Sequence, residues 1–124
     1  MVVDDTETIL QMTAEMLATF TNERICCFRS AEAAIRAFAA APLSFELVVT
    51  DLDMPEMNGA ELCQRLRAIT PESKIILTTG SADISEAKAL SLGFDAFLRK
   101  PFTMSALIEV LEKVKHSNMH LRAA

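Results

Sequence analysis

The chain has 124 residues, of which 51% are hydrophobic, and a formal net charge of −5. This length provides one hydrophobic core and is too short for two domains. The acidic balance argues against direct binding of nucleic acid or an anionic membrane, because both require clustered lysine and arginine. We therefore expect proteins or cations as partners.

Cysteine usage and the N-terminal sequence indicate a cytoplasmic protein. The three cysteines, Cys26, Cys27 and Cys63, form neither an even disulfide framework nor metal-ligand spacing. We expect them to be reduced, small apolar core residues. No basic segment followed by an apolar run opens the chain, and no apolar stretch approaches the thickness of a bilayer.

Two strand–helix units are expected in the first part of the chain. Val2 and Val3 form a short strand, and residues 25–28 form the second. Ser30 is expected to cap the second helix, which ends before Pro42. The apolar faces of the two helices are Ile9, Leu10, Thr13, Met16, Leu17 and Phe20, and then Ala31, Ala34, Ile35 and Phe38.

Three further strands are expected at residues 47–50, 75–77 and 96–98. The third helix ends at Thr70-Pro71. A capping box of Asp83 and Glu86 opens the fourth helix, which runs to Gly93. The last two apolar faces are Leu62, Leu66 and Ile69 in the third helix, and Leu107, Leu111 and Val114 in the fifth. Residues 116–124 form a tail without pattern.

Five short strands alternating with five helices predict an α/β fold with a parallel sheet covered on both faces. Ligands of such sheets bind outside the carboxyl ends of the strands. The residues expected to converge at that edge are Asp4, Asp5, Asp51, Asp53, Thr79 and Lys100.

This set of side chains suits Mg²⁺ and phosphoryl chemistry. Gathered carboxylates repel one another unless a cation neutralises them, and Mg²⁺ prefers oxygen ligands. Asp5 and Asp51 could each supply one oxygen, and a backbone carbonyl just after Asp51 a third. A carboxylate is also a competent nucleophile towards phosphorus. Lys100 and the hydroxyl of Thr79 could contact phosphoryl oxygens.

The joint pattern resembles a response-regulator receiver domain of bacterial two-component signalling. The matching features are the acidic pair at residues 4–5, Asp51 within the run at residues 48–59, Thr79-Gly80 and Lys100-Pro101-Phe102. The resemblance covers nearly the whole chain, with the receiver domain at residues 1–115. It implies a flavodoxin-like (βα)5 doubly wound five-stranded parallel sheet with strand order 2-1-3-4-5.

The resemblance also implies a role for each site residue. Asp51 is the phosphoacceptor, and Mg²⁺ is bound by Asp5, by Asp51 and by the main-chain carbonyl of Asp53, with Asp4 acting through water. Thr79 and Lys100 contact the phosphoryl group. The Lys100–Pro101 peptide bond is expected to be cis.

By the same resemblance, phosphorylation draws the Thr79 side chain towards the phosphate, and Phe97 packs into the vacated space or is ordinary core. This switch biases a partner surface made of the fourth helix, fifth strand and fifth helix. Phe97 stands where receivers frequently have Tyr. Asp53 and Ser81 occupy positions that tune the hydrolytic water, which an acidic Asp53 could either orient or repel.

The expected phosphodonor is a phosphohistidine on a sensor histidine kinase or a phosphotransfer protein, and the expected outputs are a downstream protein or a receiver homodimer. Catalysis would be limited to self-phosphorylation and slow self-dephosphorylation. The first strand is short for an interior strand. Both a stand-alone receiver and a module cut from a longer chain, such as a hybrid sensor kinase, are open readings.

Two alternatives come from other classes. Asp51-Leu52-Asp53 matches the Asp-x-Asp core of haloacid-dehalogenase-type phosphatases, but the chain is short for that fold and its cap. A phosphorylation-independent pseudo-receiver is the other alternative, against which the intact acidic and basic residues argue. His116 and His120 lie four residues apart, but with no further ligands this spacing is attributed to chance.

Overall fold

The computed structural model describes the backbone of residues 1–123 and the side chains of residues 1–115. Within this part of the chain, strands and helices alternate, with one short 3-10 helix before the third strand. In chain order the elements are β1 (Val2–Val3), α1 (Glu7–Ala18), β2 (Cys27–Phe28), α2 (Ala31–Ala40), η1 (Pro42–Ser44), β3 (Leu47–Asp51), α3 (Gly59–Ile69), β4 (Lys74–Thr79), α4 (Glu86–Ser91), β5 (Ala96–Arg99) and α5 (Met104–Ala123).

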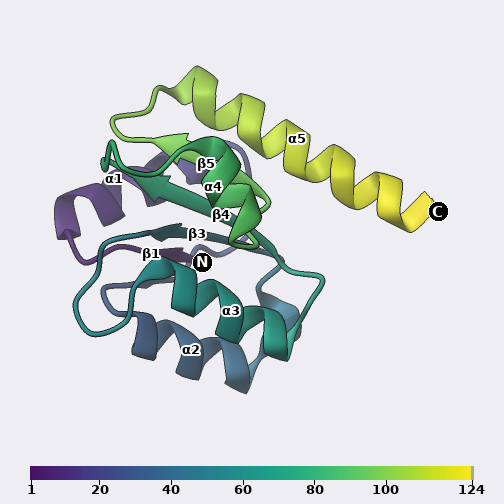
Figure 1. Cartoon of the computed structure of the whole chain (residues 1–124). Coiled ribbons are helices and arrows are strands. Elements are labelled where there is room, and N and C mark those ends of the chain that lie inside the picture. The colour runs from purple at the N-terminus through teal and green to yellow at the C-terminus, as the bar shows by residue number, and fades with distance from the viewer. Residues whose placement is uncertain (124) are drawn as a thin grey trace.

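The described strands form one parallel sheet with the order β2-β1-β3-β4-β5 (Figure 1). This order confirms the predicted doubly wound fold. The strand order reverses between β1 and β3, and ligands of such sheets bind at that reversal. The carboxyl ends of β1 and β3 therefore frame the place where a site is expected.

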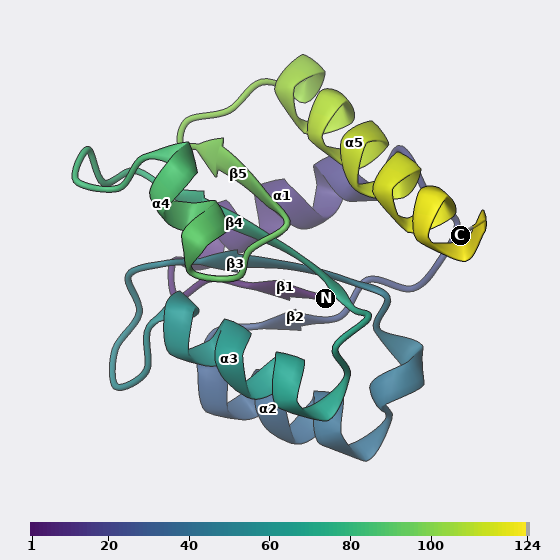
Figure 2. The same cartoon turned by 45° about the vertical axis from the view of Figure 1, so that its right-hand side comes forward.

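Helices cover both faces of the sheet, as Figures 1 and 2 show. One core packs α2, α3 and α4 against the sheet through residues such as Phe38, Leu62 and Ala89. The second core packs α1 and α5 against the opposite face through Leu10, Leu17 and Leu107. β3 and β4 are buried from both sides, which explains why their sequences read as continuous apolar runs rather than alternating ones.

The register of the sheet places the ends of the strands side by side. Asp51 pairs with Thr78 of β4, and Thr79 pairs with Arg99 of β5. The amide of Lys100 continues this ladder by donating to the Thr79 carbonyl at 2.8 Å. The polar residues that end β3, β4 and β5 are thus brought to one edge by backbone pairing alone.

β1 is short, but the N-terminal residue extends its ladder towards β3. The Met1 ammonium donates to the Leu47 carbonyl at 3.0 Å, and the Met1 carbonyl accepts from the Val49 amide at 2.9 Å. Met1 is 8% exposed, so this charged group lies inside the sheet. Burial lowers the pKa of the Met1 amine from its usual value, although Cys26, Cys27 and Glu23 act in the opposite direction.

Several local predictions are wrong. Ser85 rather than Asp83 caps α4, because its hydroxyl accepts from the Lys88 amide, while the Asp83 amide donates to the Ser81 hydroxyl. α1 ends at Ala18, which leaves Phe20 42% exposed. Cys27 is exposed and not a core residue, since β2 lies at the sheet edge. Its thiol pKa is raised, chiefly by partial burial.

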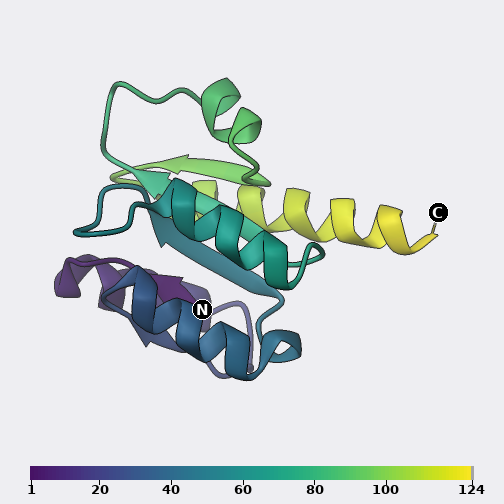
Figure 3. The same cartoon turned by 60° about the horizontal axis from the view of Figure 1, so that its bottom comes forward.

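The backbone of α5 passes the predicted boundary at residue 115 and extends beyond the sheet (Figure 3). The side chains of His116 and His120 lie outside the described residues, so the interpretation of that pair stays a prediction. Among the helices described, none is long and apolar enough to cross a membrane.

Candidate functional site

Three carboxylates meet where β1 and β3 end. Asp4 and Asp5 directly follow β1, and Asp51 is the last residue of β3. Each can offer an oxygen, and these oxygens all lie within 4.8 Å of one another. Asp4 and Asp51 are 2% and 7% exposed, and Asp5 is half-buried. The predicted convergence of these acidic residues is confirmed.

Lys100 supplies the positive charge of this cluster. Its Nζ lies 2.7 Å from Asp4 Oδ2 and 3.2 Å from Asp51 Oδ1. Burial lowers the pKa of Lys100, but the hydrogen bond to Asp4 and the charge of Asp51 outweigh this effect, so the pKa is raised overall. The ammonium therefore stays protonated at neutral pH. The Lys100–Pro101 peptide bond beside it is cis.

Asp51 is a buried carboxylate at the end of β3. Its Oδ1 accepts from the Leu52 amide at 2.9 Å. Burial raises the pKa of Asp51, Lys100 lowers it, and the neighbouring charge of Asp4 raises it again, with a net increase. A bound cation would therefore stabilise the ionised form of this buried carboxylate.

The loop from Asp51 to α3 is packed closely against the acidic residue. A Cβ added to Gly59 would lie 2.3 Å from the Asp51 carbonyl oxygen, so only glycine fits there without a shift. Asn58 caps α3 by accepting from the Glu61 amide at 2.9 Å. Glu56 has a φ of 69°, a left-handed conformation that is uncommon for residues other than glycine. The Asp53 side chain is exposed.

Thr79 lies at the carboxyl end of β4 and is completely buried. Its hydroxyl oxygen accepts from the Ser81 amide at 3.0 Å. Phe97 is half-buried in β5, two positions before Arg99, and the Arg99 guanidinium lies 5.0 Å from the centre of its ring. Among the predicted site residues, Asp51, Thr79 and Lys100 thus stand at strand ends on one sheet edge, whereas Phe97 pairs with Leu77 inside the sheet.

Two arginines at this edge are not anticipated by the sequence interpretation. Arg29 follows β2 and donates to the Asp5 carbonyl at 3.3 Å. Arg99 donates to the carbonyls of Ser81 and Ile84. The position of Arg29 at this edge could have been predicted, because β2 is parallel to the other strands and ends at the same edge. The contacts of Arg99 depend on the path of the loop before α4, which no periodicity specifies.

A hollow of about 720 Å³ lies at the opposite edge of the sheet, away from these carboxylates. Arg67 lines it and donates to the carbonyls of Pro71, Ser73 and Gly93 and to Asp95. Asp95 also accepts from the Ile75 amide at 2.7 Å. The donors of Arg67 are therefore used in joining α3 to the starts of β4 and β5.

The acidic cluster fits a small divalent cation. The three carboxylates supply only oxygen ligands, and a single lysine partly balances their charge. Mg²⁺ is a hard cation that is usually held by one or two carboxylates together with water and phosphate oxygens.

Comparison with known proteins gives a family match. The model of the family described as "Response regulator receiver domain" matches residues 1–112. The chain is 36% identical over 124 residues to the transcriptional regulatory protein FixJ of Rhizobium meliloti, covering 99% of this chain and 58% of that protein. It is 31% identical over 123 residues to the chemotaxis protein CheY1 of Helicobacter pylori, covering 95% of this chain and 97% of that one.

Coverage of these relatives varies. The chain spans about half the length of the first curated relatives, with 52% of a two-component response regulator of Arabidopsis thaliana covered at 39% identity. Solved structures are also similar. A response regulator receiver domain protein from Clostridium thermocellum has a TM-score of 0.83 and 28% identity, covering 95% of this chain and 94% of that chain.

Proposed function

Since this chain belongs to the response regulator receiver domain family of two-component systems, we propose that Asp51 is its phosphoacceptor. The observation that carries this proposal is the contact of a buried Asp51 with Lys100, beside two further carboxylates. Family membership excludes the phosphatase alternative as a description of the chain. The pseudo-receiver remains an outcome that the experiment below can detect.

The proposed reaction transfers a phosphoryl group from a phosphohistidine of a sensor histidine kinase or phosphotransfer protein. One oxygen of Asp51 forms a bond to phosphorus while the phosphorus–nitrogen bond breaks, and the bonding electron pair returns to the imidazole. Lys100 offers its ammonium to a phosphoryl oxygen and balances the charge that develops there. The Thr79 hydroxyl, at the end of the neighbouring strand β4, would donate to another phosphoryl oxygen.

Mg²⁺ would be held by Asp5, Asp51 and the main-chain carbonyl of Asp53, with Asp4 acting through water. When bound, this ion neutralises the negative charge of the carboxylates and of the incoming phosphoryl oxygens. Asp53 and Ser81 flank the approach of hydrolytic water and set the lifetime of the acyl phosphate. The proposed catalysis is confined to self-phosphorylation and slow self-dephosphorylation.

Output is proposed to pass through the surface formed by α4, β5 and α5. A hollow on this surface is lined by both apolar and charged residues, among them Phe97, Arg99, Phe102, Glu109 and Lys113. Movement of Thr79 and Phe97 would change this surface, which would bind a downstream protein or a second receiver. We place the receiver at residues 1–115 of this chain and its action in the cytoplasm.

Intact-mass spectrometry after incubation with acetyl phosphate tests the proposal. We expect one phosphoryl adduct that requires Mg²⁺ and is absent from the Asp51→Asn variant. Asp83→Asn, which changes an exposed aspartate near the same edge, is the matched control and should be labelled normally. Retained single-site labelling of Asp51→Asn would contradict the assignment. A folded protein that forms no adduct would instead be a pseudo-receiver.

A further inference from the structure

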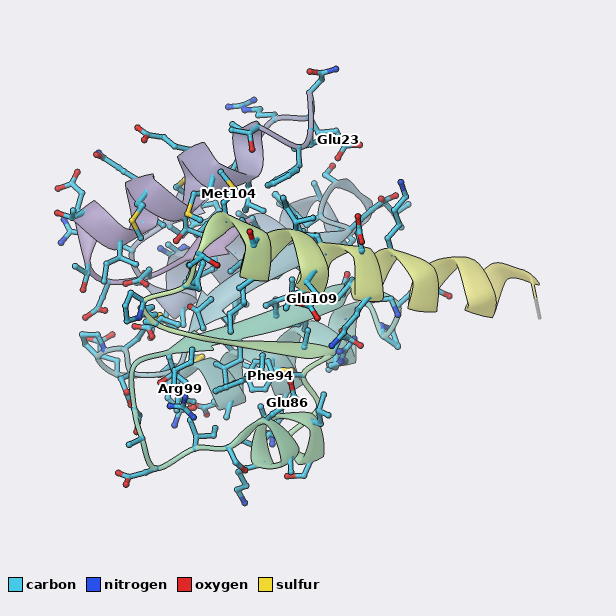
Figure 4. The ribbon with its side chains drawn as sticks, turned by 90° about the horizontal axis from the view of Figure 1, so that it is seen from above. Glu23, Glu86, Phe94, Arg99, Met104 and Glu109 are labelled. Carbon is cyan, nitrogen blue, oxygen red and sulfur yellow. The ribbon has the colours of Figure 1, made fainter. Side chains whose placement is uncertain are left out.

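Arg99 connects the two residues of the proposed switch. The Thr79 hydroxyl accepts from the Ser81 amide, and the Ser81 carbonyl accepts from Arg99 Nη1. Arg99 Nη2 donates to the Ile84 carbonyl at 2.6 Å, and its Cζ lies 5.0 Å from the centre of the Phe97 ring. In Figure 4 the Arg99 side chain lies beside the loop that leads into α4, on the side of β5 away from α5.

We propose that Arg99 is a positioning residue that couples Thr79 to Phe97 by holding the loop between β4 and α4. This proposal rests on the proposed phosphorylation of Asp51. It adds a contact through the guanidinium to a switch in which Phe97 has no hydroxyl group of its own. Arg99 is suited to this role because its planar, permanently charged group can donate to two carbonyls while it stacks on an aromatic ring.

Apart from those of Arg99, the described contacts of this loop are made to the core, to Thr79 or within the loop itself. Ile84 is 6% exposed and anchors the segment in the core, but the residues on either side, Asp83 and Ser85, are exposed. The Asp83 amide donates to the Ser81 hydroxyl at 3.2 Å, which closes the turn locally and does not reach β5. The two hydrogen bonds from Arg99 therefore connect the loop directly to the strand that carries Phe97.

Coupling follows from the competition for Thr79. If the Thr79 hydroxyl turns towards a phosphoryl group on Asp51, the Ser81 amide loses its acceptor and the turn at Ser81 rearranges. The Ser81 carbonyl then leaves Arg99, and the guanidinium no longer lies fixed over Phe97. Each of two arrangements of this loop would therefore favour one position of Thr79 and one position of Phe97. A two-state element that both residues bias is the physical requirement for coupling.

The test compares Arg99→Gln with Arg65→Gln, whose arginine is exposed on α3 and forms an ion pair with Glu61. Amide hydrogen exchange of Ser81 and Asp83, measured by NMR on the unmodified proteins, should be about tenfold faster in Arg99→Gln, as loss of a charged hydrogen bond implies. Arg65→Gln should exchange as the wild type does. Arg99→Lys keeps the positive charge but lacks the planar guanidinium that donates to two carbonyls, and it should give an intermediate exchange rate.

The second measurement follows the Phe97 ring resonances when Mg²⁺ and beryllofluoride, a phosphoryl mimic, are added. Before these additions, we expect the Phe97 resonances of Arg99→Gln to lie closer than those of the wild type to the positions seen with Mg²⁺ and beryllofluoride. On addition they should therefore move less than in the wild type. A faster exchange with an unchanged Phe97 response would overturn the coupling. So would exchange rates equal to those of Arg65→Gln.

The two proposals fail in different ways. If the wild type forms no adduct with acetyl phosphate and gives no response to beryllofluoride, phosphorylation of Asp51 is the proposal that fails. If the wild type responds and Arg99→Gln responds equally from the same starting resonances, the proposal for Arg99 fails while the phosphoacceptor stands.

Discussion

Lys100 and Asp4 form a 2.7 Å ion pair although they lie 96 positions apart in the chain. The same ammonium is 3.2 Å from Asp51, so it lies closer to the first acidic residue than to the proposed phosphoacceptor. Without a phosphoryl group, Lys100 therefore serves mainly to neutralise the carboxylates. Its two contacts also connect β5 with β1 and β3 across the sheet edge.

Replacing Lys100 by Met, an unbranched apolar side chain one heavy atom shorter, should destabilise the fold by about 3 kcal/mol in Mg²⁺-free buffer. The reason is that Asp4 would remain buried without its partner. Urea unfolding measures the loss, and added Mg²⁺ should reduce it. Lys88→Met, at an exposed position, is the control. Equal losses for the two variants would show that the ion pair contributes nothing.

Asp51→Asn should stabilise the unmodified protein at neutral pH. Because the pKa of Asp51 is raised in the folded state, its stabilising contribution is present below the usual carboxyl value of 3.8 and is lost as pH rises through the folded-state pKa. At pH 7 the negative charge of Asp51 therefore destabilises the folded state, and the neutral asparagine side chain removes this effect. We expect a gain of about 1 kcal/mol over the wild type.

The check on Asp51→Asn is the difference between variant and wild type in the free energy of unfolding, followed from pH 4 to pH 7 without Mg²⁺. That difference should grow with pH. Mg²⁺ should stabilise the wild type more than the variant, since one ligand is weakened. A variant that is less stable than the wild type at pH 7 would mean that Lys100 outweighs burial at Asp51.

The strands and the acidic site follow from local signals in the sequence, whereas the strand order came from the resemblance to receiver domains. Buried parallel strands give apolar runs, and a polar residue at the end of such a run is delivered to a known edge. Asp51, Thr79 and Lys100 could be located in this way. The start of α4 could not be located in this way, because both Asp83 and Ser85 are residue types that cap helices. The structure has a turn at Ser81 that binds the Asp83 amide, and helix-capping preferences do not predict this turn.

The contacts made by long side chains could not be predicted from the sequence either. Arg29 and Arg99 are each exposed residues at the end of a strand, and a pattern of burial assigns them to solvent. Their hydrogen bonds go to main-chain carbonyls, whose positions depend on the packed fold. Pairing of Lys100 with Asp4 is likewise set by side-chain geometry and not by sequence spacing.

Gly59→Ala should damage the site through the backbone of Asp51. The added Cβ would lie 2.3 Å from the Asp51 carbonyl oxygen and 3.1 Å from the Leu52 Cα, both main-chain atoms that cannot turn away. We expect a loss of stability of about 1–3 kcal/mol, typical of overpacking, and slower labelling by acetyl phosphate. Gly80→Ala is the matched control.

At Gly80 the nearest atom to an added Cβ is the Lys100 Cβ at 3.9 Å, an ordinary contact. Gly80→Ala should therefore retain wild-type stability to within about 0.5 kcal/mol. Urea unfolding and the rate of appearance of the adduct measure the two variants side by side. Wild-type stability and labelling in Gly59→Ala would show that the loop can move away without disturbing Asp51.

In the 124-residue chain, acetylation of the Met1 amine should stabilise the fold below pH 8. The Met1 ammonium is buried against the Leu47 carbonyl, and burial lowers the pKa of the amine from its usual 8.0. A base whose pKa is lowered in the folded state contributes stability that is present above its usual pKa and is lost as pH falls through the folded-state value. An acetylated terminus keeps one N–H donor for Leu47 without the charge, so this pH dependence should disappear.

Urea unfolding of the free and acetylated proteins at pH 6 and pH 8 provides the measurement. The free protein should lose stability towards pH 6 relative to the acetylated one, by about 1 kcal/mol for each unit by which the folded pKa lies below 8.0. Other groups titrate equally in both proteins, so their contributions cancel in the difference. A difference that does not change with pH would mean that the ammonium reaches solvent and that burial at Met1 does not govern its charge.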